Sequence, residues 1–315
     1  MNLAHAPVMT QEVLSGLNLR NGGTYIDGTF GRGGYTRAIL DSATTRVFGI
    51  DRDPNAITVG SELIDKYDGR LTLLQGRFGN ISSIMAQQGI NHVDGVMFDL
   101  GVSSPQIDDP DRGFSFRLDG PLDMRMESEG ATAADFINEA PEEEIADVIF
   151  QYGDERYSRR IARGIIAARK INPILSTFEL VRIIRANVRR SRDGIDPATR
   201  TFMALRIQVN DELGELERGL IGAERILGPG GRLAVVAFHS LEDRKVKSFL
   251  YEHSGSTAKG SRHMPDSLGP SFEPSFNLIK RGVIKPSVDE VSLNPRARSA
   301  RLRVAERTLA PAWFD

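Results

Sequence analysis

Residues 24–34 have the sequence TYIDGTFGRGG, in which a short apolar run ends in an acid and a glycine-rich loop. Residues 35–40 are expected to continue from this loop as a helix. Glycines that follow a strand let the backbone approach a ligand closely, and the N-terminus of a helix lies just beyond them. The stretch therefore predicts the first strand, turn and helix of an α/β sheet, with a ligand at the turn.

Three further apolar strands are predicted beyond this stretch, at residues 46–51, 71–75 and 94–100. Apolar strands separated by helical segments predict a parallel sheet with helices on both faces. Ligands bind beyond the carboxyl ends of such strands. Asp27, Asp51 and Asp99 lie at or next to the ends of three of these strands, so we expect all three at that edge of the sheet.

The next convincing strand, residues 231–238, comes much later than a single crossover helix requires. The intervening residues predict an inserted domain with helices at 142–152, 156–169 and 177–189. Residues 197–227 are expected to form one helix that leads back to the sheet, and 276–279 and 299–304 to form a closing pair of strands. Residues 254–274 are rich in Gly, Ser and Pro and predict a mobile loop. The predicted domains are 1–108 and 201–315 for the two parts of the sheet domain, and 109–200 for the insert.

The composition excludes several classes of protein. The 315 residues include 40 Lys and Arg against 42 Asp and Glu, and the absence of cysteine excludes disulfides, thiolate zinc sites and Cys nucleophiles. No pair of histidines has the spacing of a metal site, so we expect no metal. No apolar stretch reaches the roughly 18 residues of a membrane span, and we see no signal peptide. We therefore expect a cytoplasmic protein with no membrane partner.

The loop after the first strand is compatible with two kinds of nucleotide site, and an acid such as Asp51 could hold ribose hydroxyls in either. The dinucleotide pattern G-x-G-x-x-G would place Thr36 at its third glycine. The acid-x-G-x-G-x-G loop of S-adenosylmethionine enzymes is matched by Asp27, Gly31 and Gly33, although Thr29 replaces its first glycine. A third interpretation is a turn that only packs a helix against a strand.

Residues 99–106, DLGVSSPQ, place a polar turn with one proline after the fourth strand. Methyltransferases that act on amino groups have such a turn, because oxygen acceptors make the nitrogen of a base amine more nucleophilic and hold it in line with the methyl group. We predict that the amine is received by Asp99, Ser103, Ser104 and Pro105. An aromatic ring for stacking would have to come from elsewhere, such as Phe114 or Phe116, and an ordinary turn is the alternative.

In these motifs the chain resembles the RsmH (MraW) family, which methylates the N4 amine of a cytidine in small-subunit ribosomal RNA. The resemblance covers nearly the whole chain. It is carried by residues 5–9 (HAPVM), 27–34 (DGTFGRGG), 51–54 (DRDP), 99–106 (DLGVSSPQ), 112–116 (RGFSF), 120–126 (GPLDMRM), 197–202 (PATRTF), 238–244 (FHSLEDR) and 294–299 (NPRARS).

The resemblance implies a Rossmann-like S-adenosylmethionine-dependent methyltransferase sheet with an inserted, mostly helical substrate-recognition domain. Its acceptor would be a cytidine of 16S ribosomal RNA in the decoding region, expected within an assembled subunit; the sequence leaves open whether the chain pairs as a homodimer. Tyr35 stands where many members of the family have His. The residues that would hold the donor are Asp27, Gly31, Gly33, Gly34, Tyr35, Asp51, Phe78, Asp99 and Gln106.

Two other functions stay open from the sequence: a non-catalytic RNA-binding factor in ribosome assembly, and a nicotinamide-dependent oxidoreductase. His239 could face the site or hydrogen-bond to backbone. Arg200 and Arg206 could contact RNA phosphate or pair with nearby acids. The pairs Arg296/Arg298 and Arg301/Arg303 are out of step with each other, so one flat strand could not point all four the same way. They could still follow RNA across a bend, or they could only guard an exposed sheet edge with charge.

Overall fold

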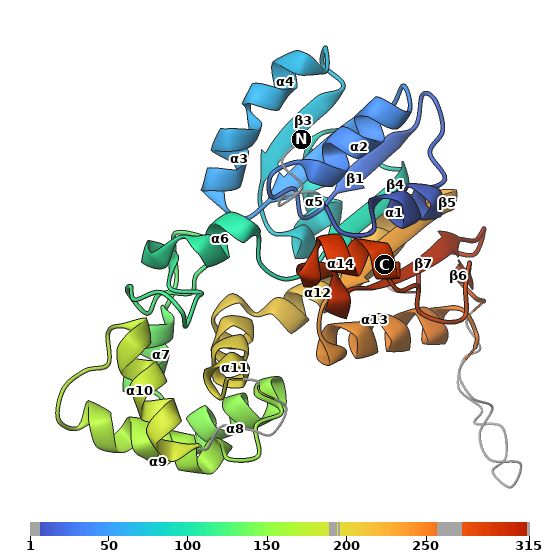
Figure 1. Cartoon of the computed structure of the whole chain (residues 1–315). Coiled ribbons are helices and arrows are strands. Elements are labelled where there is room, and N and C mark those ends of the chain that lie inside the picture. The colour runs from blue at the N-terminus through green and yellow to red at the C-terminus, as the bar shows by residue number, and fades with distance from the viewer. Residues whose placement is uncertain (1–6, 189–193, 195, 257–272, 314–315) are drawn as a thin grey trace, which may run out of the picture. The chain divides into compact units, whose positions relative to one another are not determined.

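The computed structural model describes residues 7–188, 194, 196–256 and 273–313. These residues form two compact units, one made of the described residues within 1–101 and 213–315 and the other of those within 102–212 (Figure 1). Most of the loop expected at 254–274 lies outside the described residues, as do residues 5 and 6 of the HAPVM motif and residue 189 at the end of an expected helix.

The first unit contains a seven-stranded mixed sheet with the order β3-β2-β1-β4-β5-β7-β6. The strands β1 to β5 run parallel, whereas β7 is antiparallel to both β5 and β6. The expected α/β class and the expected closing pair of strands are therefore confirmed. The strands are β1 (Thr24–Asp27), β2 (Arg46–Asp51), β3 (Leu71–Gln75), β4 (Val93–Asp99), β5 (Leu227–Ala237), β6 (Phe276–Leu278) and β7 (Arg301–Arg307).

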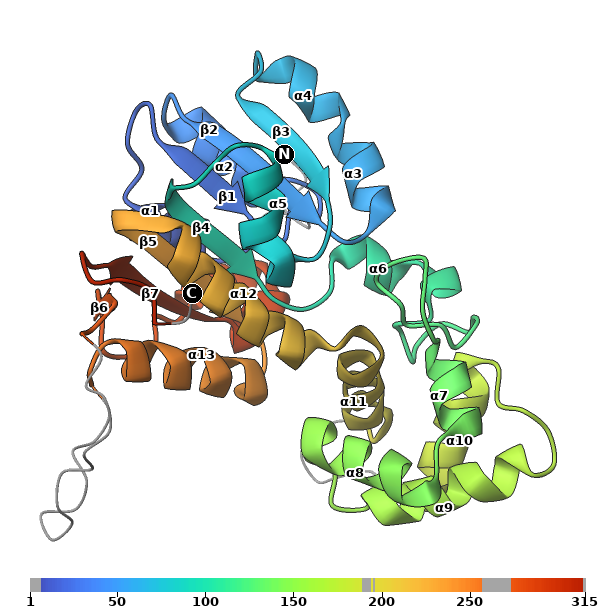
Figure 2. The same ribbon diagram turned by 180° about the vertical axis from the view of Figure 1, so that it is seen from behind.

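Helices cover both faces of this sheet, as the views from the front and from behind show (Figures 1 and 2). One face packs against α1 (Thr10–Leu17), α2 (Gly34–Ser42) and α14 (Val288–Leu293). The other packs against α5 (Ile81–Gln87), α12 (Glu212–Ile226) and α13 (Ser240–His253). The remaining short elements of this unit are α3 (Pro54–Gly60), α4 (Glu62–Lys66) and the 3-10 helices η2 (Phe78–Asn80) and η4 (Pro295–Ser299).

Two expectations about the return to the sheet are wrong in detail. The single helix expected at 197–227 is two helices, α11 (Ala198–Asn210) and α12, because Asp211 between them adopts a left-handed conformation with φ of 48°. The strand expected to begin at residue 231 begins at Leu227. Its glycine-rich start pairs with β4 through a register shift between Val93 and Gly95.

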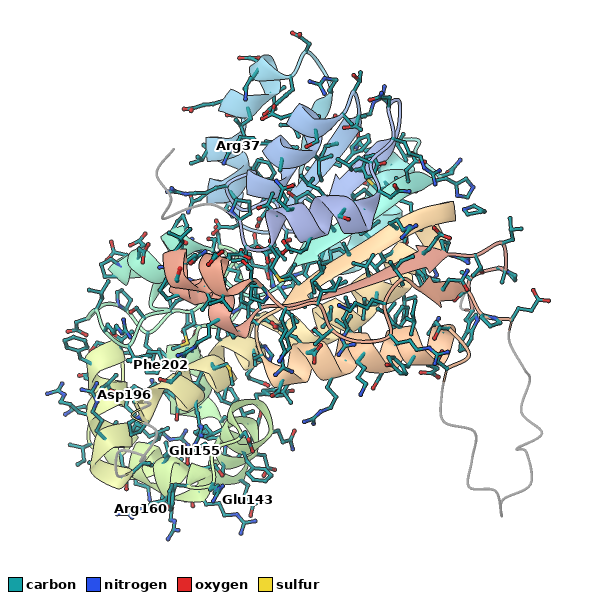
Figure 3. The ribbon with its side chains drawn as sticks, turned by 45° about the vertical axis from the view of Figure 1, so that its right-hand side comes forward. Arg37, Glu143, Glu155, Arg160, Asp196 and Phe202 are labelled. Carbon is teal, nitrogen blue, oxygen red and sulfur yellow. The ribbon has the colours of Figure 1, made fainter. Side chains whose placement is uncertain are left out.

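The second unit is helical around its own apolar core. Its elements are α6 (Ser104–Asp108), η3 (Pro110–Arg112), α7 (Ala133–Glu139), α8 (Glu142–Gly153), α9 (Ser158–Arg169), α10 (Thr177–Asn187) and α11. It extends beyond the expected 109–200 at both ends, because Val102 packs against its core and Phe202 and Leu205 of α11 are part of that core. Phe202 is labelled in Figure 3. Within the described part of the chain, no helix combines the length and apolar character needed to span a membrane.

Candidate functional site

Three carboxylic acids lie at the carboxyl ends of neighbouring parallel strands in the first unit. Asp27 ends β1, Asp51 ends β2 and Asp99 ends β4. The registers of β1 with β2 and of β1 with β4 place all three at one edge of the sheet. The expectation that these acids share an edge is therefore confirmed, and the glycine-rich turn between β1 and α2 lies at the same edge.

Asp27 is fully buried beneath that turn. One carboxylate oxygen accepts a hydrogen bond from the Thr36 hydroxyl at 2.8 Å, and the other accepts one from the Thr29 N–H at 3.3 Å. Burial raises the pKa of Asp27 to about 6, while the hydrogen bonds from Thr36 and Thr29 oppose that rise. Asp27 therefore fixes both ends of the glycine-rich turn from below.

The turn needs glycine at two of the predicted positions. Gly31 has φ of +54° and Gly33 has φ of +69°, a left-handed conformation that is unfavourable for residues with a side chain. Gly33 is also the N-cap of α2, so the backbone N–H groups that begin the helix follow it directly. A Cβ on Gly34 would lie 3.0 Å from Pro7. The turn therefore presents bare backbone at the edge of the sheet.

Asp51 is held by backbone on both of its carboxylate oxygens. Oδ2 accepts a hydrogen bond from the Gly31 N–H at 2.7 Å, and Oδ1 accepts one from the Asp53 N–H at 2.9 Å. Burial raises the pKa of Asp51, although these two hydrogen bonds offset part of the rise. The carboxylate is only half-buried, and each oxygen has a further lone pair for the hydroxyl of a ligand.

Two aromatic residues flank this edge. Tyr35 in the first turn of α2 is buried, and its hydroxyl donates a hydrogen bond to the carbonyl of Val8. Its side chain therefore anchors the N-terminal segment, which leaves its backbone for a ligand. Phe78 in η2 is half-buried, and its ring centroid lies 4.8 Å from that of Phe98.

Asp99 differs from the other two acids because one of its oxygens has no partner. Its N–H donates to the hydroxyl of Thr29 at 2.7 Å, but Oδ1 is shielded from solvent and has no hydrogen bond within the described chain. Burial raises the pKa of Asp99 well above its ordinary value, and the nearby charges of Asp27 and Glu242 add to that effect. An unpaired buried carboxyl of this kind is costly in a folded protein, so it marks a position for a ligand.

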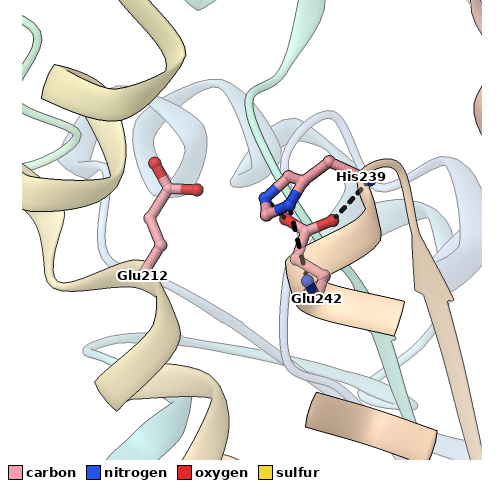
Figure 4. Close-up of side chains that lie close together, drawn as sticks. All are labelled: Glu212, His239 and Glu242. Atoms are coloured by element: carbon pink, nitrogen blue, oxygen red, sulfur yellow. Dashed lines mark hydrogen bonds and ion pairs between the residues drawn. The ribbon is translucent and has the colours of Figure 1, made fainter. Parts of the chain in front are cut away.

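Glu242 belongs to a compact arrangement at the start of α13 (Figure 4). One of its oxygens accepts the N–H groups of Phe238 and His239, at 2.8 and 3.2 Å. The other lies 2.9 Å from Nε2 of His239, while Nδ1 of the same ring accepts the Glu242 N–H at 3.4 Å. His239 is therefore the N-cap of α13, and of its two predicted roles the structure supports the hydrogen bond to backbone.

The predicted amine-receiving turn lies in the second unit. Ser103 is the N-cap of α6, and its N–H donates to the side-chain oxygen of Gln106 at 2.9 Å. Ser104 and Pro105 form the first turn of that helix. Of the two rings suggested for stacking, Phe114 is nearly buried in the core of this unit, and Phe116 packs edge-on against Phe202 with centroids 5.8 Å apart.

The arginines that the sequence singled out are mostly paired. Arg206 forms a bidentate pair with Glu212 at 2.7 and 2.8 Å, and Arg200 lies 3.6 Å from Glu155. Arg301 and Arg303, both on β7, share Asp243 of α13 at 2.9 and 2.7 Å; Arg296 and Arg298 lie on η4 instead. The two pairs of arginines therefore lie on different elements and do not share one strand.

Sequence reasoning missed several residues that hold the site in shape. Thr29 was noted only as a departure from a glycine motif, yet its hydroxyl joins the turn to β4. That departure was a usable signal, because a hydroxyl side chain in place of a glycine suggests that the hydroxyl forms a contact. Glu215 accepts the Gly79 N–H at 2.7 Å and so fixes the segment that carries Phe78, and it lies too far along the chain for any local pattern to reveal it.

A family model described as the MraW methylase family matches residues 2–308. The protein named ribosomal RNA small subunit methyltransferase H from Paramagnetospirillum magneticum is 58% identical over 309 residues, which are 98% of this chain and 97% of that protein. The protein of the same name from Rhodospirillum centenum is 59% identical over 308 residues, 98% of this chain and 93% of its own length. The one from Rhodospirillum rubrum is 53% identical over 312 residues, covering 98% and 96%.

Proposed function

The chain belongs to the MraW methylase family, and from this premise we propose that it is an S-adenosylmethionine-dependent methyltransferase of small-subunit ribosomal RNA. We further propose that it methylates the N4 amine of a cytidine in the decoding region, within an assembled subunit in the cytoplasm. The names of its relatives support the RNA acceptor. The chemistry of the buried acids supports the donor and the amine.

The residues at the sheet edge fit the donor. S-adenosylmethionine supplies an electrophilic methyl group on a cationic sulfonium centre. Asp51 would accept hydrogen bonds from the ribose hydroxyls, and the bare backbone of Gly31, Gly33, Gly34 and Tyr35 would lie against the methionine end. Phe78 would lie against the adenine. Asp27 would act indirectly, because its oxygens already hold Thr29 and Thr36.

The observation that carries the proposal is the buried, unpaired Oδ1 of Asp99. A base amine is a poor nucleophile because its lone pair is delocalised into the ring. A carboxylate oxygen that accepts one of its N–H groups favours a pyramidal nitrogen and orients the remaining lone pair. We assign this contact to Asp99. From the sequence motif alone we also propose that Ser103, Ser104 and Pro105 receive the amine, and Gln106 fixes their turn through its cap.

The helical unit is assigned to recognition of the RNA. Its helix α9 carries Arg159, Arg160 and Arg163 on its exposed surface, and none of these side chains forms an ion pair within the described chain. Arg160 is labelled in Figure 3. Unpaired cations on one helix attract a phosphate backbone without reading its sequence. This supports a role for the unit in docking the acceptor.

The first test is transfer of a labelled methyl group from S-adenosylmethionine to small ribosomal subunits that lack the modification, with naked RNA in parallel. Digestion to nucleosides should yield labelled N4-methylcytidine. Asp51→Ala should weaken donor binding by about 10- to 150-fold, because a hydrogen bond to a charged group contributes about 1.5–3 kcal/mol. Asp65→Ala removes an exposed carboxylate on α4 and is the matched control.

Three results would contradict the proposal in different places. If the wild type does not bind S-adenosylmethionine, the assignment of the donor site is wrong. If it binds the donor but transfers no methyl group to subunits or RNA, the assignment of the acceptor is wrong. If the labelled nucleoside is not N4-methylcytidine, the assignment of the methylated atom is wrong. Sedimentation of the active species would show separately whether it is a homodimer.

A further inference from the structure

A small pocket in the first unit lies beyond the carboxyl end of β5. Its volume is about 170 Å³. Its walls come from the start of α13, from the segment before α14, and from the junction of η4 with β7. We call it the β5 pocket, and its polar lining consists of His239, Ser240, Lys285, Arg298, Ser299 and Arg301.

The β5 pocket is cationic. Three of its lining residues are basic, and none of the described residues that line it is an Asp or a Glu. Arg301 is partly neutralised by Asp243, which it shares with Arg303. Lys285 and Arg298 are exposed, and neither forms an ion pair with any residue that the structure describes. The pocket therefore has uncompensated positive charge that favours an anion.

Neutral donors add to this charge. Within the first turn of α13, the N–H groups of His239 and Glu242 are satisfied by the capping arrangement. The N–H of Ser240, at the first position of the helix, has no acceptor in the described part of the chain, and Ser240 and Ser299 both line the pocket. A tetrahedral oxyanion accepts hydrogen bonds from guanidinium, ammonium, hydroxyl and amide groups at once.

The β5 pocket adjoins the position of Asp99. Strand β5 pairs with β4 so that Val236 lies opposite Asp99, and with β7 so that Ala237 lies opposite Arg301. The pocket is thus one strand away from the unpaired carboxyl along the same edge of the sheet. Glu242 connects the two places, because it contacts His239 in the pocket wall and its charge acts on the pKa of Asp99.

We propose that the β5 pocket binds a backbone phosphate of the RNA acceptor, beside the nucleotide whose amine meets Asp99. This inference rests on the proposed function, since it takes the acceptor to be RNA. A nucleotide that is turned out of its stack keeps its phosphodiester links, so a phosphate is available next to any base that reaches the sheet edge. Contacts to that phosphate would fix the position of the nucleotide without specifying its sequence.

The test uses the full-length protein with both unpaired cations removed, Lys285→Ala with Arg298→Ala. We expect the KM for subunits to rise roughly tenfold, equivalent to one charge-assisted contact, with kcat and the Kd for S-adenosylmethionine unchanged. The slope of log Kd for RNA against log salt should fall by about 0.7. The conservative variant Arg298→Lys should keep the slope. Arg46→Ala is the control, because Arg46 is exposed at the start of β2, at the opposite edge of the sheet.

Two outcomes would overturn the proposal. One is a double variant whose KM and salt slope match those of Arg46→Ala. The other is that the wild type binds inorganic phosphate by calorimetry and the double variant does not, while the slope of log Kd for RNA against log salt is the same in both. The pocket would then bind free phosphate and not the RNA backbone. If the wild type methylates no RNA, the proposed function fails, but the salt slope of RNA binding still decides whether the pocket holds a backbone phosphate.

Discussion

The unpaired carboxyl of Asp99 leads to a prediction about pH. We expect Asp99→Asn to flatten the pH dependence of S-adenosylmethionine binding. In the free protein, burial and the charges of Asp27 and Glu242 hold the pKa of Asp99 well above its ordinary value. A cationic donor stabilises the ionised form. Wild-type affinity should therefore rise with pH through the pKa of free Asp99 and level off above it, whereas the amide cannot ionise.

The size of the effect follows from the missing charge. A cation close to a buried carboxylate lowers the pKa of the carboxyl by about 1–2 units, and each unit corresponds to about 1.4 kcal/mol of interaction with the ionised form. At the alkaline end of the range, Asp99→Asn should thus bind the donor about 10- to 100-fold more weakly than the wild type. At the acid end, where both proteins are neutral at this position, the two affinities should converge.

Calorimetric titration with S-adenosylmethionine across the pH range in which the fold is intact would measure both curves. S-adenosylhomocysteine is the matched ligand, because it lacks the sulfonium charge and should give a shallower wild-type curve. Asp27, with a pKa of about 6, contributes a slope to both proteins, so the comparison isolates Asp99. The reasoning would be refuted if the affinity for S-adenosylmethionine changed with pH by the same slope in the wild type and in Asp99→Asn, or if the wild-type affinity fell as pH rises.

Two further predictions concern stability. Thr36→Val removes the hydroxyl that donates a hydrogen bond to Asp27. The free energy of unfolding should fall by about 1–3 kcal/mol at neutral pH, where Asp27 is ionised, and by less below about pH 4, where Asp27 is protonated in both states. Denaturant titration at both pH values measures these losses, and an equal loss at each pH would contradict the prediction. Burial alone would raise the pKa of Glu224, but the hydrogen bond with His253 helps to hold that pKa below its ordinary value. The stability that Glu224 contributes is therefore present above its pKa in the unfolded chain and is lost as pH falls through its pKa in the folded protein. Glu224→Gln should lower the free energy of unfolding by about 1–3 kcal/mol at neutral pH and by progressively less in acid. A loss of stability that does not shrink on acidification would count against the hydrogen bond between Glu224 and His253.

The sheet could be predicted because its signals are local. Each parallel strand is a short apolar run, and three of them end at an acid, so strand positions and the shared edge of the acids followed from pattern alone. The break at Asp211 could not be predicted in this way. The helical pattern continues through it, and only the left-handed backbone of that one residue separates the two helices.

The partners of the site could not be predicted, because they depend on contacts between distant segments. The spacing of Arg301 and Arg303 places both on one face of a strand, but nothing near them in sequence identifies Asp243 of α13 as the acid they share. The same spacing argument excluded Arg298 from that face. The structure places Arg298 on η4, where it lines the β5 pocket instead of pairing with the same acid.

The electrostatics of the sheet edge separate the two cofactors that the glycine-rich loop left open. Asp27, Asp51 and Asp99 all have raised pKa values, with burial as the largest cause, and none of them forms an ion pair within the described chain. A dinucleotide would bring a pyrophosphate, with its negative charges, to the turn above these acids, and each carboxylate would be driven further toward protonation. A ligand with a sulfonium and an ammonium group does the opposite, because it brings positive charge to carboxylates that have no cationic partner within the described chain. The burial that raises the pKa values of these acids therefore favours a cationic donor.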